Sequence, residues 1–98
     1  MKTIEKLIDN IMEEIEGAEE YAERYIECKA RGNNARASKY KEMAHDELRH
    51  AESIYEFAEA DVESIRKVYP LSVEDEESWA HAKKLMHQRI AQIKMYVA

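Results

Sequence analysis

Glu47 and His50 are the residues whose types and spacing point most directly to chemistry in this 98-residue sequence. An advance of 100° per residue turns Glu47 toward the centre of a helical apolar stripe, with His50 beside it on the same side. That stripe consists of Ala37, Tyr40, Ala44, Ala51, Ile54, Ala58, Val62, Ile65 and Tyr69. A buried carboxylate must be protonated, paired with a cation or bound to a metal, so this inward Glu-x-x-His pair is a candidate metal site.

A second pair with the same spacing, Glu42 and His45, serves as an internal comparison. The helical wheel turns this pair to the opposite side, and we expect it at the solvent surface. The two pairs have the same spacing, so only the direction of their side chains on the helical wheel distinguishes the candidate metal site from the surface pair.

Glu14 is the candidate partner of Glu47 on the preceding helix. It lies at the edge of that helix's apolar stripe, with Gly17 three residues later and Tyr21 seven residues later. A glycine in a helix interior costs about 1 kcal/mol relative to alanine, so Gly17 indicates a close helix approach or a crowded site. Glu19, which flanks the stripe on its other side, is the alternative candidate.

Three helices are expected to position these side chains. The apolar repeat predicts helices over about residues 3–31, 35–69 and 73–97, and no strands. Gly32 indicates the first break, Pro70 the second, and Ser72 is expected to cap the third helix. The prediction is one all-α domain over residues 1–98, built as a long antiparallel helical hairpin followed by a third, C-terminal helix. Its apolar face comprises Trp79, Ala82, Met86, Ile90, Ile93 and Val97.

Composition and charge narrow the classes of function. The net charge is −6 without a basic cluster, which argues against nucleic acid as a partner. No apolar run approaches the ~18 residues of a membrane span, and no export leader is recognised. The single cysteine, Cys28, cannot form an internal disulfide, so a cytoplasmic location is expected. No phosphate-binding loop or nucleophile–base pair indicates hydrolase or transferase chemistry.

The two acidic motifs together resemble a known half-site. Glu-x-x-Gly-x-x-x-Tyr over 14–21 and Glu-x-x-His-Ala over 47–51 are similar to the ligand motifs of ferritin-like di-iron proteins, among which rubrerythrins are closest in motif. The resemblance covers roughly residues 4–60. The interval from Glu14 to Glu47 is close to that of the family, which favours Glu14 over Glu19.

The resemblance implies specific roles for these residues. Glu14, Glu47 and His50 are the implied iron ligands, and hence the catalytic residues. Tyr21, together with Tyr25 or Tyr55, is an implied neighbour that orients ligands or passes an electron, although ordinary core and interface packing is the favoured explanation of these tyrosines.

Only one inward Glu-x-x-His pair is present, whereas di-iron bundles use two. The missing half is expected from a second copy, so that two hairpins form a ferritin-like four-helix bundle in a homodimer or higher homo-oligomer. This arrangement is similar to that of encapsulated ferritins. The second expected helix would also be about 50 Å long, whereas a compact chain of this size has a radius of gyration of only ~13 Å. Part of its apolar stripe would therefore stay uncovered unless a second copy covers it. No encapsulin-targeting peptide is recognised, and enclosure in a protein compartment is left open.

The expected function is ferroxidase activity, in which oxygen or peroxide oxidises Fe(II) at a di-metal site shared by two subunits, for iron storage or detoxification. Manganese or zinc could use the same ligands. The alternative is a metal-free helical dimerisation or scaffold module in which Glu47 and His50 are salt-bridged. On the third helix, Trp79 is expected to anchor the packing. His81 and His87 lie beside the apolar face, where solvated or capping roles are expected.

Overall fold

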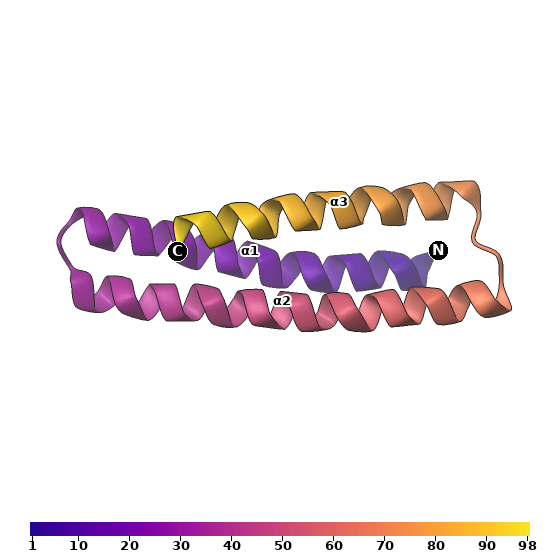
Figure 1. Cartoon of the computed structure of the whole chain (residues 1–98), viewed down its shortest axis with the longest axis horizontal. Helices are drawn as coiled ribbons and strands as arrows, with labels where there is room; N and C mark the ends of the chain where they lie inside the picture. Colours follow the sequence, from indigo (N-terminus) through magenta and orange to yellow (C-terminus); the bar gives the residue numbers. More distant parts are fainter.

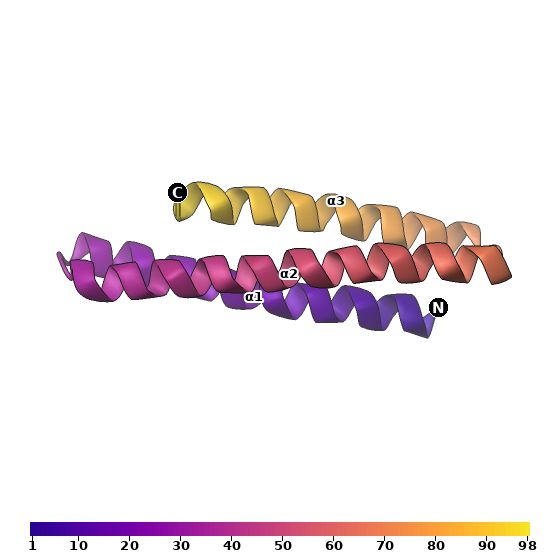
Figure 2. The ribbon, with the colours of Figure 1, turned by 60° about the horizontal axis from the view of Figure 1, so that its bottom comes forward.

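The computed structural model describes all 98 residues as three helices and no strand. These are α1 (Lys2–Ala30), α2 (Asn34–Val68) and α3 (Val73–Tyr96). The helices α1 and α2 form an antiparallel hairpin, and α3 runs back along it (Figures 1 and 2). The all-α prediction is confirmed, and each helix end lies within one residue of its expected position.

The first break is made by backbone geometry at Gly32 and Asn33. Gly32 has a φ of +77°, in the left-handed region that glycine adopts without strain. The Asn33 backbone N–H donates to the Cys28 carbonyl oxygen at 2.9 Å, which satisfies one of the last carbonyls of α1. The Asn33 side chain then accepts a hydrogen bond from the Arg36 N–H and caps the start of α2.

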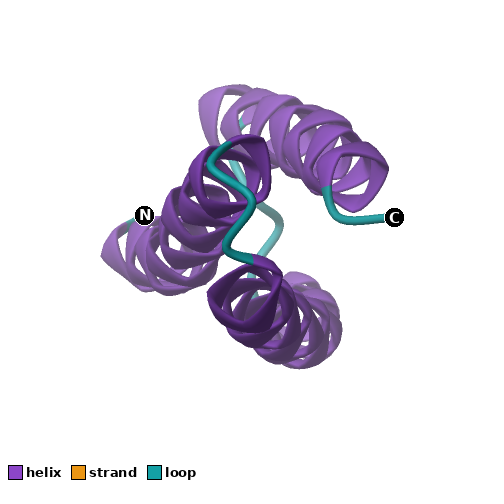
Figure 3. Cartoon of the chain, turned by 90° about the vertical axis from the view of Figure 1, so that its left-hand side faces the viewer, coloured by secondary structure: helices purple, strands orange, loops and turns teal.

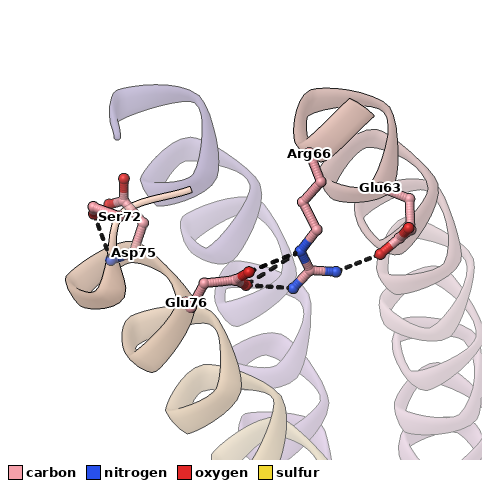
Figure 4. A network of polar contacts seen from close by, with 5 residues as sticks. All are labelled: Glu63, Arg66, Ser72, Asp75 and Glu76. Atoms are coloured by element: carbon pink, nitrogen blue, oxygen red, sulfur yellow. Dashed lines mark hydrogen bonds and ion pairs between the residues drawn. The ribbon is translucent and has the colours of Figure 1, made fainter. Parts of the chain in front are cut away.

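The second break is stabilised by side chains on both of its sides (Figure 4). Ser72 Oγ accepts a hydrogen bond from the Asp75 N–H at 3.1 Å, which confirms the expected cap of α3. On α2, Arg66 donates from Nε to both carboxylate oxygens of Glu76 at 3.2 Å and also pairs with Glu63. Arg66 therefore ties the end of α2 to the start of α3.

The core is apolar throughout. Eighteen residues are buried and none of them is polar or charged. All six residues predicted for the apolar face of α3 are among them. Trp79 is 1 % exposed and its ring stacks on that of Tyr55 at a centroid distance of 6.3 Å, so it anchors α3 to the hairpin of its own chain.

The chain is elongated, with principal extents of 54 × 19 × 18 Å and a radius of gyration of 16.0 Å. A compact chain of this length would have a radius of only ~13 Å. Viewed along the helices, the three helices occupy the corners of a triangle (Figure 3). None of the helices combines the length and apolar character that a membrane crossing requires.

Candidate metal centre

Glu14, Glu47 and His50 come together across the hairpin. One ligand atom from each residue lies within 4.8 Å of the others. His50 Nδ1 lies 3.7 Å from Glu14 Oε2 and 3.6 Å from Glu47 Oε1. These distances exceed ordinary hydrogen bonds, so the imidazole faces both carboxylates across a small gap. No other three carboxylate, imidazole or thiol groups of the chain lie this close together.

Glu19, the alternative first-helix candidate, lies elsewhere. Its carboxylate accepts a hydrogen bond from Arg89 Nε on α3 at 2.6 Å. Arg89 also lies beside the Met12 sulfur, at 3.8 Å from Nη1. The side of α1 that carries Glu19 is therefore covered by α3, while Glu14 joins the cluster with Glu47 and His50. Sequence reasoning did not find this role of Arg89, because nothing in the spacing of α1 and α3 residues shows which of them face one another.

The Glu47 carboxylate lies closely against α1 at Gly17. A Cβ on Gly17 would lie 3.0 Å from Glu47 Oε2. The site at Gly17 is therefore crowded, as expected, and the group that crowds it is the carboxylate of Glu47.

The two carboxyl groups influence each other's protonation. The pKa of Glu47 is raised above its ordinary value, chiefly by a hydrogen bond with Glu14. Burial and the negative charge of Glu14 act in the same direction, while His50 opposes them. Glu47 therefore retains a proton to a higher pH than an isolated glutamate does, unless a cation replaces that proton.

In the single chain the His50 side chain is 61 % exposed, so it does not lie in the buried core. Glu47 is more sheltered, with a side chain 25 % exposed. The physical reason lies in the true buried face of α2, which includes Leu48 at 2 % exposure. Leu48 was missing from the predicted stripe, and its inclusion turns the centre of that face away from Glu47.

Two of the tyrosines implied as neighbours of the ligands lie at different places. Tyr21 is half-buried, and its ring stacks on Tyr40 at a centroid distance of 6.2 Å. Tyr25 is buried, and its hydroxyl accepts a hydrogen bond from Lys29 at 3.2 Å. Tyr25 lies eleven positions after Glu14, about 16 Å along the helix axis, so packing accounts for Tyr25.

The remaining histidines lie outside the cluster. His45, expected at the surface, is half-buried, because the end of α3 lies over it and its Nε2 donates to the Val97 carbonyl oxygen at 3.0 Å. Its motif partner Glu42 is exposed, as expected. His81 and His87 are both exposed, and His87 Nε2 lies 3.1 Å from the hydroxyl of Tyr55.

The donor set of the cluster fits a metal ion. Two carboxylates and one imidazole are ligands that iron, manganese and zinc all accept. None of the hollows on the surface of the chain is lined by these three residues, so the cluster is an open site on the hairpin.

No family model, curated protein or solved structure matches the chain.

Proposed function

We propose that two copies of the chain pair through their hairpins and bind two ferrous ions between Glu14, Glu47 and His50 of both copies, as a ferroxidase centre. The observation that carries this proposal is the convergence of the three ligand atoms within 4.8 Å. The resemblance of the two acidic motifs to those of ferritin-like di-iron proteins supports the same ligand set. In such bundles, one Glu from each of two helices and one Glu-x-x-His from each of the other two enclose the metals.

A single chain supplies half of that set, and its open side favours a second copy. His50 is 61 % exposed, so the cluster has free space on one side for further ligands. Met43 and Phe57 on α2 lie four residues before Glu47 and seven after His50, and both are exposed apolar side chains. Residues at these intervals share the face of α2 that carries the ligands. A two-fold contact along this face would bury the apolar side chains and bring two half-sites together.

The chemistry requires a change in protonation at the site. Carboxylates bind metal in their ionised form, so metal binding displaces the proton that Glu47 otherwise retains. Each ferrous ion, as substrate, gives up one electron. Dioxygen takes up two electrons and two protons to become hydrogen peroxide, or peroxide takes up the same number to become two water molecules. Glu14, Glu47 and His50 hold the two cations near each other and neutralise their charge.

A metal-free scaffold is the second candidate, and one observation favours it. Because the Glu14 carboxyl group lies within 4.8 Å of Glu47 and raises its pKa, the two carboxyl groups can share a proton. A shared proton would let this face enter a dimer interface without a metal ion. The two candidates differ in what neutralises the carboxylates, a proton or a pair of cations.

Native mass spectrometry after anaerobic loading with Fe(II) separates the two candidates. The wild type is expected to carry two iron ions per pair of chains, and Glu47→Ala to carry none. Glu42→Ala is the matched control, because Glu42 belongs to the same type of motif but is exposed. Oxidation of the bound iron is then followed by absorbance after oxygen or peroxide is added. A dimer that takes up no iron would contradict the ferroxidase proposal and support the scaffold.

A further inference from the structure

Gly17 lies where the Glu47 carboxylate comes closest to α1. A Cβ built on Gly17 would lie 3.0 Å from Glu47 Oε2, 3.6 Å from its Cδ and 3.7 Å from its Cγ. The first of these distances is tighter than ordinary van der Waals contact between carbon and oxygen. The carboxylate of Glu47 therefore occupies space that any other side chain at position 17 would fill.

The backbone gives no reason for a glycine here. Gly17 lies in the middle of α1, and the only positive φ of the chain is at Gly32. Every residue except proline adopts helical angles more readily than glycine does. The absence of a side chain at Gly17 is thus explained by the neighbour across the hairpin and not by local conformation.

We propose that Gly17 is a positioning residue for the metal site, an inference that rests on the proposed function. Its missing side chain leaves room for Glu47 Oε2 against α1, while Oε1 of the same carboxylate faces His50 Nδ1 at 3.6 Å. The two oxygens of Glu47 thus have different neighbours, and this sets the orientation of the carboxylate plane. A methyl group at position 17 would displace Oε2 and disturb the convergence of Glu47 with Glu14 and His50.

The proposal predicts that stability and metal affinity change in opposite directions in Gly17→Ala. The carboxylate is the end of a flexible side chain, so it can move by a few tenths of an ångström at little cost to folding. Alanine is the better helix former, so the melting temperature of the metal-free protein should rise, by roughly 8 °C at most. The affinity for metal should fall about tenfold or more, as is typical when the support of a ligand is altered. A glycine needed only for close helix packing would instead lower the melting temperature and leave affinity unchanged.

The test uses Co²⁺ as a spectroscopic probe of the full-length chain. Calorimetric titration gives the dissociation constant, the visible absorption of Co²⁺ reports its ligand geometry, and thermal unfolding in chelator gives the stability. Gly17→Ala is expected to show weaker binding and an altered spectrum without a loss of stability. Glu16→Ala, an exposed change in the same helical turn, should match the wild type in affinity and spectrum. Wild-type affinity and spectrum in Gly17→Ala would overturn the proposal.

A double-mutant cycle tests the contact itself without metal. In a Glu47→Ala background, the new methyl group meets no carboxylate, so Gly17→Ala should raise the melting temperature more than it does in the wild type. Equal effects in both backgrounds would show that Gly17 and Glu47 do not interact, and the proposal would be wrong. This outcome differs from failure of the proposed function, which would appear as a wild type that binds no Co²⁺ or Fe(II).

Discussion

A carboxylate oxygen of Glu47 on α2 lies within 4.8 Å of one of Glu14 on α1, and the interaction with Glu14 raises the pKa of Glu47. Two ionised carboxylates this close repel each other, and a proton or a cation between the helices relieves that repulsion. In the proposed metal centre, protons and metal ions therefore compete for the same place. The proposal therefore predicts that both the stability of the protein and its affinity for metal depend on pH.

The first prediction concerns Glu47→Gln in the metal-free protein. The folded state binds its proton at Glu47 more tightly than the unfolded chain does, so stability falls as the pH rises from about 4.5 through the raised pKa. Glutamine imitates the protonated side chain and is not subject to this loss. Glu47→Gln should therefore melt at a higher temperature than the wild type at pH 7, and the difference should disappear below pH 4.5. The melting temperatures are measured at each pH by circular dichroism in the presence of chelator. Glu42→Gln, a substitution at an exposed residue, is the control. Identical melting temperatures at pH 7 would contradict the prediction.

The second prediction separates the two candidate ligands on α1. Glu14→Gln should weaken metal binding by about tenfold or more, because it removes a charged ligand from the cluster. Glu19→Gln should leave metal binding unchanged, since Glu19 pairs with Arg89 on the other side of α1. Glu19→Gln should instead lower the free energy of unfolding by up to about 1 kcal/mol, because it removes a partly exposed ion pair. Calorimetric titration with Fe(II) under anaerobic conditions compares the affinities of the two variants. Weaker binding in Glu19→Gln and unchanged binding in Glu14→Gln would make Glu19 the ligand.

The third prediction links metal binding to stability. A ligand present at one hundred times its dissociation constant stabilises the folded state by about 2.7 kcal/mol, so Fe(II) or Co²⁺ should raise the melting temperature and a chelator should reverse the rise. If the site is shared by two chains, the melting temperature of the loaded protein should also increase with protein concentration. Glu47→Ala should show no response to metal. Scanning calorimetry at several concentrations measures both effects, and a concentration-independent response would argue for a site within one chain.

The fourth prediction tests the anchor of α3. Trp79 is 1 % exposed and stacks on Tyr55, so Trp79→Ala should reduce the free energy of unfolding by about 3–5 kcal/mol. Met95→Ala is the matched control on the same helix, because Met95 is 78 % exposed, and it should change stability by no more than about 0.5 kcal/mol. Urea unfolding followed by circular dichroism compares the two. A mild effect of Trp79→Ala would show that α3 does not depend on this contact.

The fifth prediction concerns the tyrosine beside Trp79. Burial raises the pKa of Tyr55 to about 12, with further contributions from Glu59. The stability contributed by the neutral hydroxyl should therefore decline as the pH rises from about 10 to about 12. Ultraviolet titration of the six tyrosines should show one late component that is missing in Tyr55→Phe. A titration in which Tyr55→Phe removes an early component instead would contradict the assignment.

The sequence by itself determined the three helices and their ends. Gly32 and Pro70 cannot continue a helix without cost, and Ser72 offers a side-chain acceptor at the right place, so local chemistry is sufficient to locate the breaks. The apolar face of α3 was equally predictable, because six apolar residues at helical spacing leave only one side to bury. The convergence of Glu14, Glu47 and His50 followed from helix direction together with the family resemblance.

Only the tertiary structure decided which side of the hairpin is covered. Glu14 and Glu19 flank the same stripe of α1, and periodicity treats both flanks alike. The packing of α3 breaks this symmetry, because Arg89 pairs with Glu19 and leaves Glu14 on the open side with Glu47 and His50. The same packing places the end of α3 over His45. A helical wheel gives the direction of each side chain from its own axis, but contacts with a distant helix depend on how the chain turns back in three dimensions.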